Sequence, residues 1–362
     1  MSKIISIGTA VPKHKHDQSE ILNFMSRIYA FNEKDRRGLK YLYRQSSINN
    51  RYSVLPDYSL PPEKWVFYPP NENLEPFPSL EKRMQVFNEF APALSVKAIE
   101  DCLDGHLDVQ DVTHLITVTC TGLSAPGLDL QIMDLLNLTN RNIFRTSINF
   151  MGCYAAIHAL KLADALCSGD PSAKVLIVCT ELCTLHFQQG ATLDNITSSL
   201  IFGDGSAAIL IAGNHHAGGF PIRGFFGEVM TKGKQDMSWT VSSTGFTMTL
   251  SSYIPALIEE DFDKLVSSAL LKQGINFDEI TRWSIHPGGR KILEVIEKSL
   301  HLEKENLDAS YRVLHDYGNM SSPTILFVLK EILKTLSPEK KENIFGAAFG
   351  PGLTMETFIV SN

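Results

Sequence analysis

The stretch Asn149-Phe150-Met151-Gly152-Cys153-Tyr154-Ala155-Ala156 decides how the rest of the chain is interpreted. The residues just upstream, 143–145, are typical of a short strand, and the Ala- and Leu-rich run 154–167 predicts a buried helix. Cys153 is therefore expected on a turn from strand to helix, where Gly152 supplies backbone freedom. At a helix N-terminus, the dipole and the unpaired N–H groups favour a thiolate over a thiol. The pattern thus indicates a nucleophilic cysteine.

Cys153 has a second interpretation, because most free cysteines are small buried core residues. Two residues further along bear on this choice. His286 closes a predicted strand and is followed by Pro-Gly-Gly, which exposes the imidazole at the strand end. Asn319 precedes a helix that Pro323 helps to start, although Asn is also a common helix cap. A Cys, a His and an Asn, each at the end of an element, favour catalysis when taken together.

Composition limits the class of protein. The chain has 362 residues, 44% of them hydrophobic, which suffices for a large core in one domain or two halves. A net charge of −7 argues against nucleic acid or an anionic membrane surface as partner. No apolar run reaches the roughly 20 residues of a spanning helix, and the N-terminus lacks a signal-peptide layout. The six cysteines show no zinc-site spacing. We therefore expect a reduced, cytoplasmic enzyme without integral membrane contact and without a metal.

Strands alternate with helices along the chain, which predicts an α/β protein. Residues 173–181 are nearly all apolar, as a strand covered on both faces should be, and 80–103 form a long amphipathic helix. The proline-rich residues 55–79 predict an irregular surface excursion. No boundary is sharp. A division near 212–220 predicts an N-terminal half, 1–215, with the nucleophilic Cys and a C-terminal half, 216–362, with the His and the Asn.

The combination of Cys, His and Asn suits two kinds of chemistry. Papain-like hydrolases use the Asn to orient the His. Decarboxylating condensing enzymes use His and Asn as two hydrogen-bond donors to a thioester oxygen. The signature around the papain-type cysteine is absent here.

Motifs across nearly the whole chain resemble the type III polyketide synthases, the chalcone synthase-like family with the thiolase fold, and in particular its bacterial members. The matching stretches are Phe77–Arg83, Asn149–Ala156, Ile201–Gly205, Ile285–Gly289, Tyr317–Ser322 and Phe349–Thr357. The resemblance implies a thiolase-like αβαβα layered fold with two pseudo-duplicated halves. It also implies a homodimer, in which the loop around Ala125 and Pro126 reaches into the partner's cavity.

The resemblance further implies roles for the three residues. Cys153 would take a starter acyl group from an acyl-CoA thioester and hold the growing chain, and His286 would help to keep it a thiolate. His286 and Asn319 would bind the thioester carbonyl of malonyl-CoA and stabilise the enolate that forms as CO₂ leaves. No metal or redox cofactor is expected, and the CoA thioesters are substrates.

Other positions of the family fall on identifiable residues. Those expected to line the substrate cavity are Cys120, Thr121, Ala125, Cys183, His186, Phe202, Met248, Ser321, Phe349, Gly350 and Pro351. Those expected to bind CoA are Arg37, Lys40, Arg44 and Lys291. The basic residues at 36–51 have a plainer interpretation as a solvated helix face.

The cavity positions point to two kinds of substrate. Thr121, Ala125 and Cys183 resemble members that bury a long fatty acyl starter and make alkylpyrones or alkylresorcinols, which is the interpretation we favour. Cys120 instead resembles members that condense malonyl-CoA alone into tetrahydroxynaphthalene, or that make phloroglucinol. His186 is larger than the usual threonine and would narrow an acyl tunnel. A non-catalytic acyl-CoA-binding protein of the same fold is the alternative from a different class.

Overall fold

In the computed structural model, described for residues 2–29, 32–71, 73–138, 142–337 and 339–362, one large sheet runs through the molecule. Within the described residues it has nine strands. Their order is β11 (Arg282–Ile285), β12 (Asn343–Gly350), β13 (Thr354–Ser361), β8 (Phe220–Val229), β1 (Ser2–Ala10), β7 (Asp204–Gly213), β6 (Lys174–Leu182), β4 (His114–Thr119) and β5 (Phe144–Asn149).

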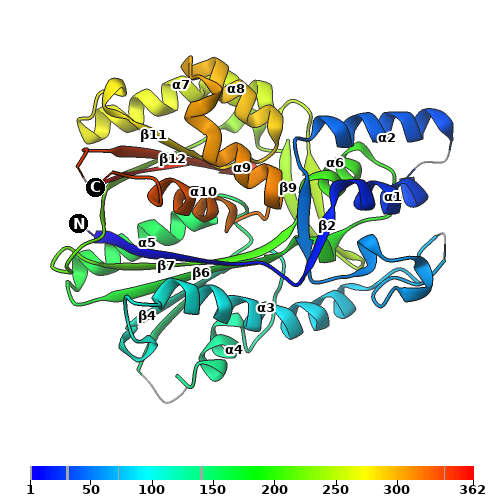
Figure 1. Ribbon diagram of the computed structural model, residues 1–362, viewed down its shortest axis with the longest axis horizontal. Helices are drawn as coiled ribbons and strands as arrows, with labels where there is room; N and C mark the ends of the chain where they lie inside the picture. The colour runs from blue at the N-terminus through cyan, green and yellow to red at the C-terminus, as the bar shows by residue number, and fades with distance from the viewer. Residues whose placement is uncertain (1, 30–31, 72, 139–141, 338) are drawn as a thin grey trace.

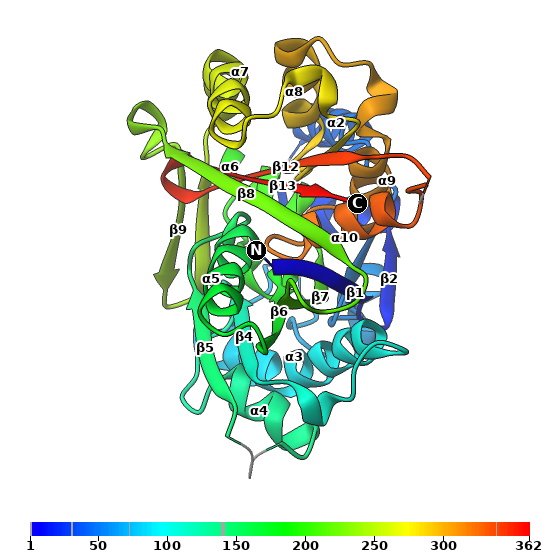
Figure 2. The ribbon, with the colours of Figure 1, turned by 90° about the vertical axis from the view of Figure 1, so that its left-hand side faces the viewer.

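The sheet has two parts, which join where β1 pairs with β8 through Lys3–Pro221 and Ile4–Phe220. Figures 1 and 2 show α5 (Ala155–Gly169) and α10 (Thr324–Leu333) between the two parts. The outer layers are α7 (Ile254–Gln273) with α8 (Arg290–Leu300) on one side, and α3 (Leu80–Leu103) with α4 (Leu128–Leu135) on the other. This is the five-layered αβαβα arrangement that the resemblance implied.

The two central helices are buried because their side chains are small or apolar. Ala155, Ala156, Ala159 and Ala163 on α5 are fully buried in an apolar cluster that includes residues of both parts of the sheet. Small side chains let the strands approach the helix closely, and interiors close-pack at such contacts. The buried α5 therefore holds its N-terminal turn, which carries Cys153, at the junction of the two parts.

The remaining elements include α1 and α2, which lie on the right of Figure 1. They are α1 (Gln18–Tyr29), α2 (Glu33–Gln45), α6 (Leu193–Ile201), α9 (Asp308–Tyr317), the ladder of β2 (His14–Asp17) with β3 (Asn50–Ser53) and the ladder of β9 (Met237–Ser242) with β10 (Gly245–Leu250). Among the described helices, none is both long and apolar enough to cross a membrane.

Several expectations from the sequence are confirmed. The helix over 80–103 has the expected limits, and the apolar strand is β6. The described residues of the range 55–79 contain only two short 3₁₀ turns. The ladders β2–β3 and β9–β10 and the helices α6 and α9 were not expected. Strand β10 and its partner are rich in Ser and Thr and only half-buried, so they lack the apolar pattern that marks a strand. The division of the chain at 215/216 stays a prediction.

Candidate active site

The chain turns from β5 into α5 through residues with unusual backbone angles. Phe150 and Gly152 both have positive φ, 58° and 83°. A Cβ at Gly152 would lie 2.2 Å from the Pro351 ring, so this position needs glycine for both its backbone angle and its space. Cys153 follows directly, two residues before α5 begins at Ala155. The predicted place of Cys153, on a strand-to-helix turn, is confirmed.

Cys153 differs from the other cysteines in its exposure. All six cysteines lie within the described residues, and five of them are buried, while Cys153 keeps partial exposure to solvent. The six are free thiols. A core residue would be buried like the rest, so this difference favours the nucleophile over the core residue.

Asn319 and Ser321 surround the Cys153 sulfur. The sulfur lies 4.0 Å from Asn319 Oδ1 and 3.6 Å from Ser321 Oγ. Asn319 is itself held in place, because its Oδ1 accepts from Ser321 N at 2.8 Å and its Nδ2 donates to Gly288 O at 3.4 Å. Gly288 belongs to the loop that follows His286. The fold therefore brings Cys153 beside Asn319, and it holds Asn319 against the loop that follows His286.

His286 is buried, and both of its ring nitrogens lack a hydrogen-bond partner in the described part of the chain. Burial lowers the pKa of His286 to about 3, so the ring is neutral and one nitrogen carries a proton. Its expected help in holding Cys153 as a thiolate is not visible, since no hydrogen bond joins the two side chains among the described contacts. A buried donor without a partner is costly, and a bound carbonyl oxygen would satisfy it.

The thiolate expected at Cys153 stays a prediction, and the surroundings of the thiol oppose it. Burial raises the pKa of the Cys153 thiol to about 11, the Glu181 carboxylate acts in the same direction, and Ser321 and Asn319 act against them. The helix N-terminus is a modest favourable influence, and in a water-poor site the loss of hydration outweighs it. These influences together favour the thiol over the thiolate in the free chain.

Glu181 is a buried carboxylate that sequence reasoning missed. It lies near the end of β6, and its Oε2 accepts from Cys120 N and Thr121 Oγ1, both at 2.8 Å, while its Oε1 accepts from Ser322 Oγ at 2.6 Å. Burial raises the pKa of Glu181 to about 7, in spite of these hydrogen bonds. A signal was present in the sequence, since Glu181 is the acidic residue at the end of an otherwise apolar run.

We expect Glu181→Gln to lower the pKa of the Cys153 thiol and to raise its alkylation rate at pH 8 to 9 several-fold. The reason is that the variant removes a nearby negative charge and keeps a side chain of the same shape. The pH dependence of the difference in alkylation rate follows from the ionisation of Glu181. Above pH 7 the wild-type carboxylate is charged and opposes the thiolate, whereas below pH 6 it is neutral and the two enzymes converge.

The measurement is the rate of Cys153 alkylation by iodoacetamide against pH, followed by intact-protein mass. Glu342→Gln is a matched control, because Glu342 is also buried but pairs with Arg282. Equal alkylation rates for wild type and Glu181→Gln at pH 8 to 9 would contradict this electrostatic coupling.

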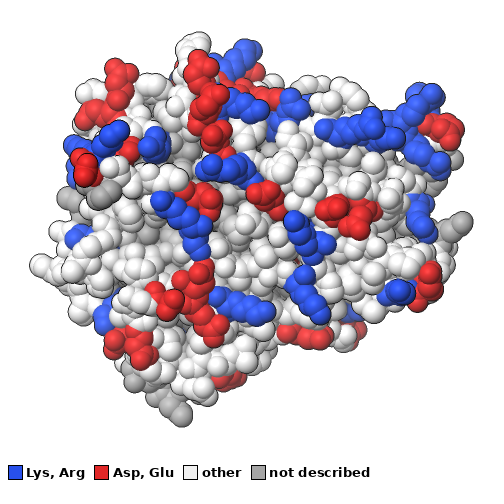
Figure 3. Space-filling view, viewed as in Figure 1, with Lys and Arg blue, Asp and Glu red and all other residues white. Residues whose placement is uncertain are grey.

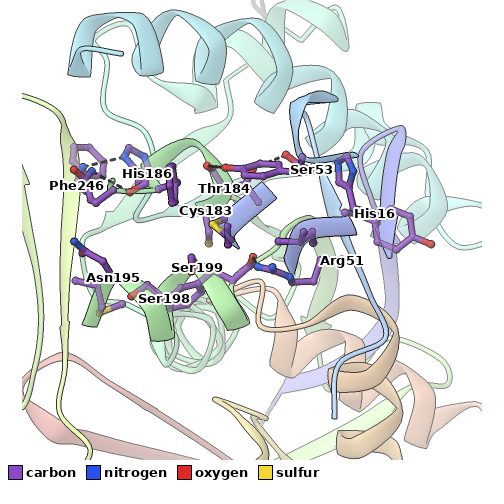
Figure 4. A pocket seen from close by; sticks show the side chains of 18 of the residues that line it. His16, Arg51, Ser53, Cys183, Thr184, His186, Asn195, Ser198, Ser199 and Phe246 are labelled. Carbon is purple, nitrogen blue, oxygen red and sulfur yellow. Dashed lines mark hydrogen bonds between the residues drawn. The ribbon is translucent and has the colours of Figure 1, made fainter. Parts of the chain in front are cut away.

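A narrow cavity lies next to Phe202, which forms an isolated bridge with Asn319. Four of the expected cavity residues line it, namely Cys183, His186, Phe202 and Met248. Figure 4 shows the lining side chains in two rows with open space between them.

Aromatic side chains form one end of this cavity. His186 stacks on Phe246, with ring centroids 4.2 Å apart, and both meet the edge of Trp239. His186 Nδ1 accepts from Phe246 N at 3.0 Å, so Nε2 carries the proton and donates to Thr121 O at 2.8 Å. Burial lowers the pKa of His186 to about 3, and the ring is a fixed, neutral part of the wall. Trp239, which donates to Cys120 O at 2.7 Å, was missed in the sequence.

The other expected cavity residues lie outside the lining of this cavity. Ser321 lies beside Cys153, Cys120 accepts a hydrogen bond from Gly152 N through its sulfur, and Thr121 is buried against Glu181. Phe349 packs on Phe262, and the ring of Pro351 abuts Gly152. Gly350 lies against Tyr154. Ala125 is exposed on a surface loop.

The expected CoA-binding residues lie in two groups. Lys40 and Arg44 line a groove between α1, α2 and α9, which Lys304 and Arg312 also line. Figure 3 shows Lys and Arg side chains gathered over α2. Arg37 and Lys291 are not part of that lining. Within the described residues, no group of three or more His, Cys, Asp or Glu side chains is placed to hold a metal ion.

Two family models match the chain and cover most of it. The model for chalcone and stilbene synthases, N-terminal domain, matches residues 1–215, and the model for the C-terminal domain of the same enzymes matches residues 226–362.

Curated relatives and solved structures agree with these matches. A probable polyketide synthase 1 of Dictyostelium discoideum is 31% identical over 100% of this chain, which spans only 11% of that protein. Type III polyketide synthase C of Arabidopsis thaliana is 28% identical, with 99% of this chain and 94% of the relative covered. The crystal structure of the C-terminal type III polyketide synthase domain of Steely1, a type I/III hybrid from Dictyostelium, superposes with a TM-score of 0.90 at 29% identity, covering 100% of this chain and 99% of that one. PKS-I of the brown alga Ectocarpus siliculosus has a TM-score of 0.89 at 28% identity, covering 99% and 97%.

Proposed function

The chain belongs to the chalcone and stilbene synthase family, the type III polyketide synthases, and from this premise we propose that it loads an acyl starter from CoA onto Cys153 and extends it with malonyl-CoA. Each extension would be a decarboxylative Claisen condensation, and the finished chain would cyclise. The observation that carries the proposal is the contact of a partly exposed Cys153 with Asn319, which in turn bonds the loop after a buried His286 whose ring has no partner among the described residues. This arrangement also argues against the non-catalytic acyl-CoA-binding alternative.

The roles of the three residues follow from their surroundings. Cys153 attacks the thioester carbonyl, and CoA leaves as its thiol. The neutral His286 ring and Asn319 Nδ2 then donate hydrogen bonds to the malonyl thioester oxygen, which gains negative charge as CO₂ departs. Donors that are in place before the reaction stabilise this charge without reorganising. We propose that the reaction needs no metal or redox cofactor, since CoA thioesters supply both carbon units.

We propose a long-chain fatty acyl starter as the first substrate class, leading to alkylpyrones or alkylresorcinols. Cys183, Met248 and Phe202 give the cavity small or flexible apolar walls beside the catalytic residues. Each CH₂ that such a cavity takes from water contributes about 0.8 kcal/mol, or roughly a fourfold gain in kcat/KM. An acyl chain would extend along Cys183. The His186 ring is fixed by two hydrogen bonds, so it would block an acyl chain that extended past His186.

The alternative is a synthase of the tetrahydroxynaphthalene or phloroglucinol type that uses malonyl-CoA alone. The observation that favours it is the aromatic wall of His186, Phe246 and Trp239, which limits the space for a long starter.

The test is mass spectrometry of the products that the purified protein makes from malonyl-CoA, alone and with acyl-CoA starters of increasing length. Products that carry the starter, formed fastest from long chains, support the fatty acyl proposal. An aromatic product from malonyl-CoA alone supports the alternative. Trp239→Ala should shift the preferred starter to longer chains, whereas Trp239→Phe keeps the wall and should not. No product under any of these conditions would overturn the proposed function.

We also propose that the protein acts in the cytoplasm as a homodimer, without nucleic acid as a partner. The exposed loop at Ala125 supports the dimer, because a cavity residue of the family is on the surface of the single chain here. Sedimentation velocity at micromolar concentration checks the dimer, and a clean monomer would contradict it.

A further inference from the structure

Two adjoining grooves on the surface around α2 are lined by many more cations than carboxylates. The larger groove, between α1, α2 and α9, has a volume of about 740 Å³, and the smaller one, between α1 and α2, has a volume of about 350 Å³. Leu22 and Lys40 line both, so the two are treated together as the basic groove. Among the described residues of the two linings, the carboxylate is Asp308, and the cations are Arg27, Arg36, Lys40, Arg44, Lys304 and Arg312.

The cations of the larger groove lack counter-charges. No ion pair within the described residues joins Lys40, Arg44 or Arg312 to a carboxylate, and Lys304 lies over the Tyr311 ring at 5.1 Å. The chain as a whole has a net charge of −7, so the groove is a local exception to it. Like charges gathered in one hollow repel one another, and an anionic partner in the groove would relieve this repulsion.

Apolar and aromatic side chains lie between these cations. Tyr43 and Ile48 are buried in the lining of the larger groove, and Leu22 and Tyr311 are half-buried there. A hollow with apolar residues inside and cations around it complements an amphipathic helix, whose apolar face enters the hollow while its acidic residues meet the cations. A lipid surface is flat and would leave the hollow unfilled. The shape therefore favours a protein helix.

The cations are spread over a distance that one small anion does not span. Arg36 and Arg44 are eight residues apart on α2, so they are separated by about 12 Å along its axis. Arg312 comes from α9, a different helix. Figure 3 shows the Lys and Arg side chains over α2 as an extended group. A phosphate group bonds its donors at about 3 Å, whereas an acidic helix presents carboxylates along its whole length.

Both walls of the basic groove connect to the catalytic residues. On α2, Gln45 Oε1 accepts from Arg290 Nη1 at 3.3 Å, and Arg290 directly follows the loop 286–289. On α9, Arg312 lies five residues before the end of the helix, about 8 Å along its axis, and Asn319 follows two residues after that end. A partner in the groove would therefore lie beside the segments that hold two of the three catalytic residues.

We propose that the basic groove docks an acidic helical protein that carries the acyl starter as a thioester on a pantetheine arm. The proposal rests on the proposed function, because Cys153 receives the acyl group. It deepens the substrate class, since CoA ends in the same pantetheine thioester and the groove selects the protein-bound donor. In the transfer, the Cys153 sulfur forms the new thioester bond, the pantetheine sulfur leaves, and the thiol proton of Cys153 ends on the pantetheine thiol.

The test compares two donors of the same acyl group, namely acyl-CoA and the acylated carrier protein of a fatty acid synthase, which is small, acidic and helical. The readout is the rate of Cys153 acylation by intact-protein mass, at equal donor concentrations well below saturation. We expect the carrier protein to acylate Cys153 about tenfold faster than CoA at low salt. This advantage should shrink as salt is added, because salt screens the charges at the surface.

The double variant Lys304→Glu with Arg312→Glu reverses two charges of the groove that are not among the residues expected to bind CoA. It should slow acylation by the carrier protein about tenfold and change acylation by acyl-CoA less than about twofold. Both residues are exposed, so thermal unfolding should match that of the wild type. Lys97→Glu is the matched control, because Lys97 is exposed on α3, away from α2 in Figure 1, and both rates should stay unchanged.

Calorimetric binding of the carrier protein without its acyl group separates failure of the docking site from failure of the proposed function. If the wild-type protein binds it and the double variant does not, but neither donor acylates Cys153, the docking site stands and the proposed function falls. If acyl-CoA reacts as fast as the acylated carrier protein, or if the double variant and Lys97→Glu behave alike, the docking site is overturned. Binding of anionic phospholipid vesicles in place of the carrier protein would also overturn it.

Discussion

Cys153→Ala is expected to abolish formation of extended products, with a loss on the order of 10³-fold or more. The reason is that the acyl chain needs a covalent attachment between successive condensations. The other five cysteines are buried, and none of them combines exposure with contact to Asn319. No second thiol is therefore placed to replace Cys153.

The measurement is the product yield from malonyl-CoA and the best starter, together with the protein mass after incubation with the starter alone. The wild-type protein should gain one acyl group, and Cys153→Ala should gain none. Cys167→Ala is a matched control, because Cys167 is on the helix that follows Cys153 but is buried near Ala173. Unchanged product formation by Cys153→Ala would show that the proposed mechanism is wrong.

Asn319→Ala and His286→Ala are each expected to slow the decarboxylation of malonyl-CoA by about 10²- to 10³-fold, the usual effect of removing one donor to a developing oxyanion. Acylation of Cys153 by the starter should fall much less, because the two donors are proposed to act on the malonyl thioester. Among the described contacts, Asn319 Nδ2 has only the long bond to Gly288 O and the His286 ring has none, so both can turn toward a ligand.

The decarboxylation assay follows acetyl-CoA release, and acylation is followed separately by intact mass. Asn306→Ala, at an exposed helix-capping position, provides the control for a general effect of Asn replacement. If Asn319→Ala slows acylation as much as decarboxylation, its role is to position Cys153, and the oxyanion role is contradicted.

Glu181 shows how a neighbour from another segment changes the chemistry of a predicted residue. From its local sequence, Cys153 should be a thiolate, since it precedes a helix. In the structure, burial and the Glu181 carboxylate raise its pKa instead. The local pattern placed Cys153 correctly on the turn before α5. Its ionisation, however, depends on the exclusion of water and on the charge of Glu181, which lies on β6 and is separated from Cys153 in the sequence by the whole of α5.

The cavity residues also divide into those that the sequence predicted and those that only the structure revealed. The family resemblance predicted eleven cavity positions, and four of them, Cys183, His186, Phe202 and Met248, line one cavity in the structure. The resemblance did not reveal Trp239, because that residue lies in the Ser- and Thr-rich ladder β9–β10, which has little strand signal.

The sequence by itself determined the α/β class, the long helix α3, the apolar strand β6 and the placement of Cys153, His286 and Asn319 at the ends of elements. These features follow from short-range periodicity, glycine and proline positions and helix-starting residues, all of which act within a few residues. Only the tertiary structure decided the exposure of Cys153, the neutral state of His286 and the wall at His186. The physical reason is that burial, hydrogen-bond partners and pKa values depend on atoms from segments far apart in the chain, which local patterns do not bring together.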